Sequence, residues 1–212
     1  MLTGVICESG CTKVIFMKYL PLILVCVFLF GCTTHRPQNI NNACSIVQEY
    51  PSWYYDAKES YLKWGIPISV QLAMIRSESH FKANAVPPRK WYLGFIPGSR
   101  ISTAYGYSQA LDGTWAEYES STGNSGASRS DFADSVDFIG WYGNLLHKKL
   151  NIQKTDTYRL YLAYHQGPYN FKKIKKSTHS KIMNYAMKTQ TWAWKYASQL
   201  KKCQIPSKGW WF

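Results

Sequence analysis

The chain has 212 residues, which is enough for one domain with a substantial hydrophobic core. Hydrophobic residues make up 46% of it and charged residues only 17%, a composition that argues against an intrinsically disordered protein. The formal net charge of +13 suits a polyanionic partner, that is, a nucleic acid, an anionic membrane or an anionic cell-wall polymer.

The N-terminal part has the layout of a secretory signal peptide. An apolar run, residues 19–30, follows a basic residue and is too short to span a bilayer comfortably. It leads into residues 29–32 (LFGC), which resemble a bacterial lipobox. We therefore expect residues 1–31 to be removed, with translation starting either at Met1 or at Met17, and Cys32 to become a lipidated N-terminus.

This layout predicts where the protein resides. A lipidated Cys32 implies a periplasmic protein anchored to a membrane through its lipid, and Thr33 after it favours the outer membrane. The alternative is that residues 19–30 form an ordinary buried hydrophobic segment.

The remaining cysteines predict a disulfide. Three of the six precede the proposed cleavage site: Cys7, Cys11 and Cys26. With Cys32 lipidated, Cys44 and Cys203 remain, and an oxidising compartment favours a bond between them. Neither has the neighbours of a zinc site, and we expect no metal.

The next elements are a tether and two helices. Residues 32–43 are the lipidated cysteine and a polar tether, and the folded domain is expected to occupy residues 44–212. Apolar residues at helical spacing after residue 44 predict a helix that Gly65 ends. A second helix is expected over about 67–82, because proline suits a first helical turn. The proline- and glycine-containing segment 83–104 reads as a long loop.

Three more helices follow. Residues 112–114 (DGT) are typical of a turn or a helix start, and residues 119–130 of a loop. A third helix begins near Phe132, with aspartates in its first turn, where the helix dipole favours them. A fourth runs over about 156–165 and breaks at Gly167-Pro168, and a fifth covers about 180–202. Since no segment alternates as a strand would, the fold class is mainly α in a single domain, with little or no β.

Glu78 is the first candidate for chemistry. It shares one stripe of the second helix with Ile68, Gln71 and Ile75, at the edge of an apolar face. A carboxyl group that loses solvation there has a raised pKa, which a general acid needs near neutral pH. The alternative is a glutamate that points into solvent from a helix end.

Short motifs around Glu78 resemble those of a known family. They are residues 75–81 (IRSESHF), 104–109 (AYGYSQ), 134–140 (DSVDFIG) and 163–167 (AYHQG), followed by Tyr185. In this order they resemble the Glu-Ser motif, the Gly-Leu-Met-Gln motif, the helix before the third motif, the Ala-Tyr-Asn-x-Gly motif and the late tyrosine of the soluble lytic transglycosylase (SLT) family. The resemblance covers about residues 60–200 and implies a lysozyme-like fold of the goose-type/SLT kind.

The resemblance implies an activity and a set of roles. Glu78 would act as acid and then base in cleaving the MurNAc–GlcNAc β-1,4 bond of peptidoglycan, leaving 1,6-anhydro-MurNAc without any cofactor. The residues expected to position Glu78 or contact the glycan are Ser79, Gly106, Tyr107, Gln109, Tyr164, His165 and Tyr185. Tyr185 is also able to reach Glu78, and His165 departs from the family's asparagine.

Other readings of these residues remain open. Asp112 could supply a second carboxylate and make the protein a hydrolytic muramidase, or it could simply cap a helix. A non-catalytic glycan-binding accessory of a secretion or conjugation system is a third reading. We find no helix-turn-helix pattern and expect no nucleic-acid partner. Segment 87–102 is longer than expected between two motifs and suggests a lid or cleft wall, whereas the apolar tail 210–212 has no assigned role.

Overall fold

Seven helices and one two-stranded sheet make up the described part of this computed structural model, residues 36–173 and 180–209. In chain order they are α2 (Ala43–Glu49), α3 (Pro51–Trp64), α4 (Ile68–Ser79), β1 (Arg89–Tyr92), β2 (Ile96–Arg100), α5 (Asp112–Thr122), α6 (Phe132–Leu150), α7 (Thr157–Phe171) and α8 (Ser180–Leu200). The predicted mainly α fold class is confirmed. Within the described residues, no helix is long and apolar enough to cross a membrane.

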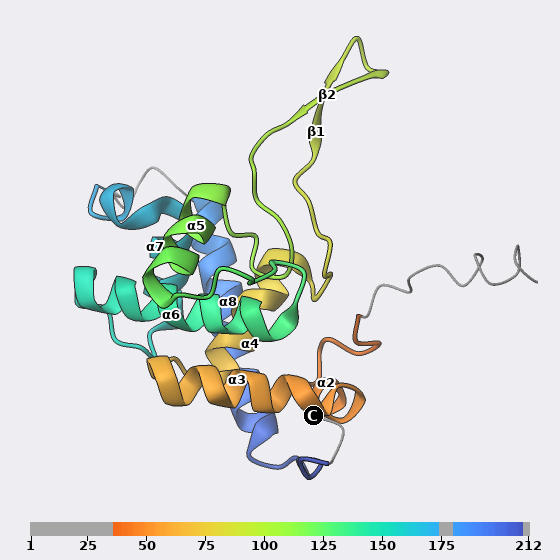
Figure 1. The fold of residues 1–212 in the computed structure, drawn as a ribbon, viewed down its shortest axis with the longest axis vertical. Coiled ribbons are helices and arrows are strands. Elements are labelled where there is room, and N and C mark those ends of the chain that lie inside the picture. Colours follow the sequence, from red (N-terminus) through yellow and green to blue (C-terminus); the bar gives the residue numbers. More distant parts are fainter. Residues whose placement is uncertain (1–35, 174–179, 210–212) are drawn as a thin grey trace, which may run out of the picture. The chain divides into compact units, whose positions relative to one another are not determined.

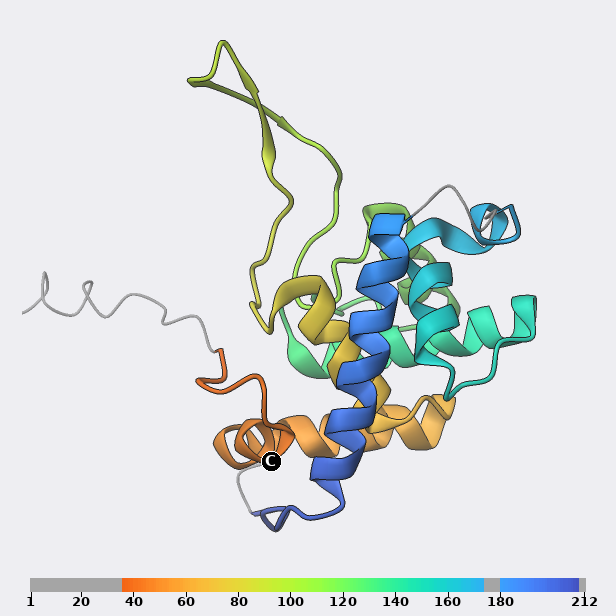
Figure 2. The same ribbon diagram turned by 180° about the vertical axis from the view of Figure 1, so that it is seen from behind.

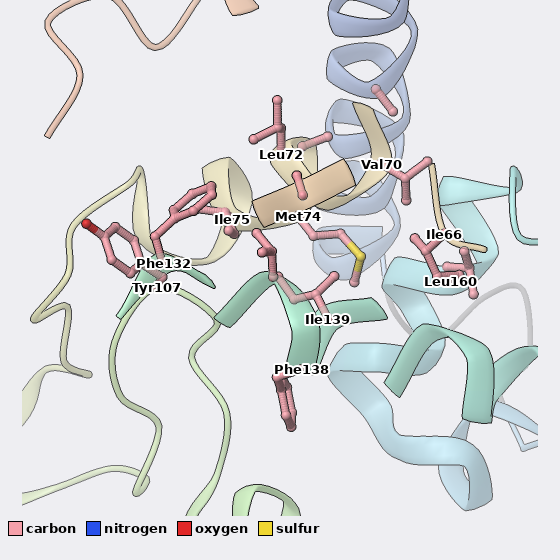
Figure 3. Close-up of a cluster of buried hydrophobic side chains, with 14 of the residues drawn as sticks. Ile66, Val70, Leu72, Met74, Ile75, Tyr107, Phe132, Phe138, Ile139 and Leu160 are labelled. Atoms are coloured by element: carbon pink, nitrogen blue, oxygen red, sulfur yellow. The ribbon is translucent and has the colours of Figure 1, made fainter. Parts of the chain in front are cut away.

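Helix α4 is the central element of the helical body. It packs against α3, α6 and α8, and Figure 2 shows α8 running alongside it. Its apolar side chains, Met74 among them, belong to the same buried cluster as Ile139 of α6 (Figure 3). A short helix buried on several sides is held in place by its neighbours, so a residue at its end has a well-defined position.

The helix ends lie close to where the sequence signals put them. Gly65 closes α3 with a φ of 78°, and Asp131 caps α6 by accepting a hydrogen bond from the backbone N–H of Asp134. Pro67 precedes the first residue of α4 instead of occupying its first turn. The predicted break in α7 is present at Gly167, although the chain resumes a helical path as far as Phe171.

The predicted disulfide between Cys44 and Cys203 is confirmed. Their Cα atoms are 5.3 Å apart, and the bond links α2 to the chain just after α8. Cys32, the signal segment 1–31, residues 33–35 and the tail 210–212 lie outside the described residues.

The segment before α2 differs from the predicted tether. From Arg36 onward it is bound to the domain: Arg76 donates to the Oδ1 of Asn41 at 2.8 Å, and the Tyr196 hydroxyl donates to the Ile40 carbonyl. Asn42 caps α2, whose first residue, Ala43, is fully buried. The prediction of a tether up to residue 43 is therefore wrong for residues 36–43, because their polar groups bind the body.

The predicted loop 83–104 contains a hairpin. Strands β1 and β2 pair antiparallel, with Arg89 opposite Arg100 and Tyr92 opposite Ile96. Both views show the hairpin projecting away from the helices (Figures 1 and 2). Every residue of β1 is exposed, so neither face of the strand is constrained to be apolar. The alternation of apolar and polar residues that normally predicts a strand is therefore missing from the sequence.

Candidate active site

Glu78 lies in the last turn of α4, at a sharply defined helix end. His80 and Phe81 both adopt positive φ angles, 53° and 60°, which turn the chain out of the helix. The Phe81 ring is fully buried and stacks on Trp53 with centroids 5.9 Å apart. The buried ring fixes the turn, and the turn fixes the position of Glu78.

The Glu78 side chain lines a cleft of about 520 Å³. The walls come from the base of the hairpin, the segment before α5, and helices α6 and α7: Pro87, Pro88, Ser102, Ala104, Gln109, Ala110, Leu111, Thr114, Phe138, Tyr142, Tyr164, His165, Gln166 and Gly167. Glu78 is the one carboxylic acid among these described lining residues. The expectation that segment 87–102 forms a cleft wall thus holds for its ends.

Burial dominates the electrostatics of Glu78. Desolvation raises the pKa of its carboxyl group to about 8, although a hydrogen bond donated by the Tyr161 hydroxyl opposes this by favouring the carboxylate. Oε1 of Glu78 is buried and has no hydrogen-bond partner among the described residues. The group therefore carries its proton at neutral pH, which is the state of a general acid.

Tyr161 is a site residue that the sequence analysis missed, as it also missed the cleft-lining Tyr142. Tyr161 lies in α7, its ring is almost fully buried, and it donates to the carboxyl group that Tyr185 was expected to reach. Tyr185 is half-exposed and does not line the cleft. Tyr161 precedes the predicted Tyr164 by three residues, which puts both on one face of a helix, and that spacing was the available signal.

Two predicted residues of α7 do line the cleft. The Tyr164 hydroxyl donates to the Ser108 carbonyl at 2.6 Å, and its ring meets Tyr142 edge to face at 5.4 Å. His165 beside it is exposed, and partial loss of hydration lowers the pKa of its imidazole, which is therefore neutral at pH 7. Gly167 follows with φ 73° and ψ 156°, a backbone conformation accessible almost only to glycine.

Gln109 also lines the cleft, and its amide is held by the backbone. Its Nε2 donates to the carbonyls of Ala85 and Gly106, each at 2.9 Å. Both amide hydrogens are then committed, so the amide can meet a ligand through the Oε1 acceptor.

Three other predicted glycan-contacting residues belong to the frame of the site. Ser79 is buried and donates to the Ile75 carbonyl of its own helix. Gly106 has a φ of 76°, and a Cβ there would lie 1.9 Å from the Arg129 carbonyl oxygen. Tyr107 packs edge to face on Phe132 in the core (Figure 3). None of the three lines the cleft. The prediction that they contact the glycan failed because a short motif does not show which way each side chain points.

Asp112 lies outside the Glu78 cleft. It is the first residue of α5, with Leu111 at the capping position, and it forms an ion pair with Arg129 at 2.8 Å. It lines a neighbouring pocket instead. The reading of Asp112 as the second carboxylate of a hydrolase is therefore not supported by its position, and the reading as a helix cap is wrong by one residue.

Comparisons with known proteins show the family of the chain and support its fold. A family model described as the transglycosylase SLT domain matches residues 20–203. Among solved structures, the fold is similar to the lytic transglycosylase Slt of Pseudomonas aeruginosa, solved as an inactive mutant, with a TM-score of 0.54 and 18% sequence identity. That alignment covers 77% of this chain and 28% of the other, and at this identity it shows the fold alone. No curated protein matches the chain.

Proposed function

Because the chain belongs to the transglycosylase SLT domain family, we propose that it is a lytic transglycosylase that cleaves the glycan strands of peptidoglycan. The observation that carries this proposal is the isolation of Glu78, whose protonated carboxyl group is the one acid among the described residues lining the cleft. A single carboxyl group must then serve both steps of the reaction.

In the first step Glu78 is the general acid. Its raised pKa keeps the carboxyl group protonated at neutral pH, so it can give that proton to the glycosidic oxygen between MurNAc and GlcNAc. The bond breaks as positive charge develops on the sugar ring. The Tyr161 hydroxyl then stabilises the carboxylate that Glu78 has become.

In the second step the Glu78 carboxylate is the base. It takes the proton of the muramoyl 6-hydroxyl, whose oxygen attacks the anomeric carbon of the same sugar to close a 1,6-anhydro ring. A glycosidase that adds water ordinarily needs a second carboxylate about 5–9.5 Å away to act as nucleophile or base. The described cleft walls provide no such group, which favours an intramolecular attack.

The cleft walls supply the contacts for the sugars. The rings of Tyr142 and Tyr164 form an aromatic wall on which sugar faces can pack, and the buried ring of Phe138 supports them from behind. We assign to Gln109 Oε1 the role of accepting a hydrogen bond from an N-acetyl N–H, since both of its amide hydrogens are committed to the backbone. His165 at the rim, neutral at pH 7, offers a donor or an acceptor near the cleaved bond.

Product analysis tests the proposal. Digestion of purified cell-wall sacculi should release fragments ending in anhydro-MurNAc, each lighter by one water than the corresponding reducing fragment. Glu78→Gln should lower the rate by roughly 10²- to 10⁴-fold. Glu59→Gln, which alters an exposed glutamate ion-paired to Lys208, should leave it unchanged. Reducing ends would instead identify a hydrolytic muramidase, and no release at all would identify a glycan-binding accessory.

We also propose that the protein is lipid-anchored in the periplasm, with the outer membrane favoured. The basis is the apolar run 19–30 and the lipobox-like residues 29–32. Metabolic labelling with a radioactive fatty acid should mark the wild-type protein, and Cys32→Ser should abolish the label. A labelled Cys32→Ser protein would contradict the anchor.

A further inference from the structure

The tip of the hairpin presents apolar side chains directly to solvent. Leu93 is 82% exposed and Phe95 71% exposed, and four more large apolar residues nearby are also exposed: Trp91, Tyr92, Ile96 and Ile101. Figure 1 shows the hairpin reaching away from every helix of the body. Apolar residues gathered at an exposed projection mark a surface that binds something.

The backbone conformation at the tip is poorly suited to the apolar residue that occupies it. Leu93 and Gly94 have φ angles of 52° and 79°, and the Phe95 N–H bonds to the Tyr92 carbonyl across the turn. Glycine or asparagine fits such a position best, whereas leucine is strained there. Leucine at position 93 is thus unfavourable for two reasons, because its backbone is strained and its apolar side chain is exposed to water. The fold by itself gives no reason for a leucine at this position.

The base of the same hairpin is cationic. Between Glu78 and Asp112 the sequence contains four basic residues and no acidic one. Arg89 and Arg100 are opposite each other in the strand register, an arrangement that is unfavourable in water. The Arg89 guanidinium donates to the Gly98 carbonyl and that of Arg100 to the Pro87 carbonyl, and neither forms an ion pair with a described residue. An anionic surface would neutralise this repulsion.

We propose that hairpin 89–100 docks the protein on a bilayer containing anionic phospholipids. Its apolar tip enters the interfacial region, where aromatic side chains are favoured, and Arg89, Lys90 and Arg100 meet the lipid phosphates. Aliphatic side chains such as Leu93 and Ile96 offer no flat ring for stacking on a sugar, so the tip fits hydrocarbon better than glycan.

Docking would also place the cleft relative to the membrane. Pro87 and Pro88 at the base of the hairpin line the cleft that holds Glu78. From Pro88 to Leu93 a strand spans roughly 17 Å at about 3.3 Å per residue. Because Arg89 and Arg100 meet the lipid phosphates at the base of the hairpin, docking would hold the cleft next to the lipid surface, about that far from the inserted tip.

Hydrogen exchange of the hairpin amides tests the proposal in the full-length chain. The protein is reconstituted in vesicles of phosphatidylglycerol and phosphatidylcholine, in pure phosphatidylcholine vesicles, or in detergent. Every sample contains the same N-terminal segment, which could by itself hold the protein on a vesicle. The test therefore measures exchange at the hairpin amides and not binding of the whole protein. We expect hydrogen exchange in residues 89–100 to be slowest with the anionic vesicles. In a second measurement, brominated lipids should quench the fluorescence of Trp91, which is identified as the part of the signal that Trp91→Phe removes.

Matched variants separate docking from general effects. Leu93→Ser combined with Phe95→Ser should abolish the protection, and Arg89→Ser combined with Lys90→Ser should abolish the difference between anionic and neutral vesicles. Leu62→Ser is the control, because Leu62 is as exposed as Phe95 but lies on α3, and it should keep the protection. Thermal unfolding of each variant, unchanged from the wild type, excludes misfolding.

Three results would overturn the proposal. They are equal exchange in anionic vesicles and detergent, protection that persists in the Leu93→Ser, Phe95→Ser protein, and protection produced by soluble glycan fragments without lipid. The last would make the hairpin a glycan-binding element. None of these measurements depends on glycan cleavage, so a failure of the proposed enzymatic activity would leave the test intact.

Discussion

Two opposing interactions act on the carboxyl group of Glu78. Burial favours the protonated form, and the hydrogen bond from Tyr161 favours the carboxylate, with burial the larger effect. Both states are needed in one catalytic cycle, the acid first and the base second. A group with a pKa of about 8 and one good donor can alternate between them near neutral pH.

Removing the Tyr161 hydroxyl should shift the pH profile. Activity that requires protonated Glu78 should fall as the pH rises through about 8. Tyr161→Phe removes a bond to the carboxylate form, so the pKa of Glu78 should rise and the falling limb should move to higher pH. The measurement is kcat/KM against pH on soluble glycan fragments.

Tyr185→Phe is the matched control for Tyr161→Phe. Tyr185 is half-exposed and is not the donor to Glu78, so its variant should keep the falling limb near that of the wild type. A shifted limb for Tyr185→Phe together with an unshifted limb for Tyr161→Phe would contradict the geometry and restore the sequence-based expectation.

The raised pKa of Glu78 also predicts how stability depends on pH. The folded protein binds this proton up to a pH of about 8, whereas an unfolded glutamate releases it near its ordinary pKa of about 4.3. Stability present at acidic pH should therefore be lost as the pH rises from about 4.3 to 8, by at most about 5 kcal/mol. Glu78→Gln should match the wild type near pH 4 and be the more stable protein at pH 9. Thermal unfolding across this range measures the difference, and parallel curves would disprove the shift.

At the scale of elements, the break in α7 decides what its C-terminal half presents to the cleft. Gly167 adopts a conformation outside the helical region, and His165 and Gln166 before it line the cleft. Gly167→Ala should destabilise the protein by about 1–3 kcal/mol, because alanine tolerates that backbone poorly. A Cβ there would touch nothing within 4 Å, so the effect should come from the backbone alone.

Gly113→Ala is the matched control for Gly167→Ala. Gly113 lies inside α5, and a Cβ there also meets nothing within 4 Å. Alanine should stabilise a helical position by up to about 1 kcal/mol. Denaturant unfolding of both variants compares the two glycines directly, and equal effects of the same sign would refute the assigned strain.

The longer helices were predictable from the sequence, whereas helix α5, the break between α2 and α3, and the hairpin were not. Apolar spacing together with Gly65 and Asp131 marked α3 and α6, because helix periodicity and caps are local properties. The strands carry no such mark, since the hairpin buries neither face. In the sequence its apolar residues look like part of a proline-rich loop.

The candidate site was predictable only where a motif fixed a residue's direction. Glu78 follows from its motif and from the edge of an apolar stripe, and the structure places it in the cleft. Tyr107 lies in the core because the direction of a side chain within an irregular segment depends on tertiary packing. The partner of Glu78 depends on how α7 lies relative to α4, so the pairing with Tyr161 required the structure.

At the scale of the whole molecule, the disulfide joins the two ends of the folded unit. Cys44 and Cys203 are 159 residues apart, and the Gln199 side chain near the second cysteine accepts a hydrogen bond from the Ala43 N–H at 2.8 Å. A cross-link over so long a loop restricts the unfolded chain strongly, by about 5 kcal/mol in the chain-entropy model. It therefore holds α2 and the segment before it against α8.

Replacing both cysteines should lower the thermal stability of the whole domain. Cys44→Ala combined with Cys203→Ala is expected to lower the Tm by on the order of 10 °C, given the loop entropy and the size of the domain. Calorimetry with and without a reductant gives the measurement. The reductant should lower the wild-type Tm toward that of the double variant and leave the variant itself unchanged, because no other disulfide joins the described residues. A wild-type Tm that stays the same while thiol titration shows both cysteines reduced would mean that the contacts of α2 with α8, and not the covalent bond, close the domain.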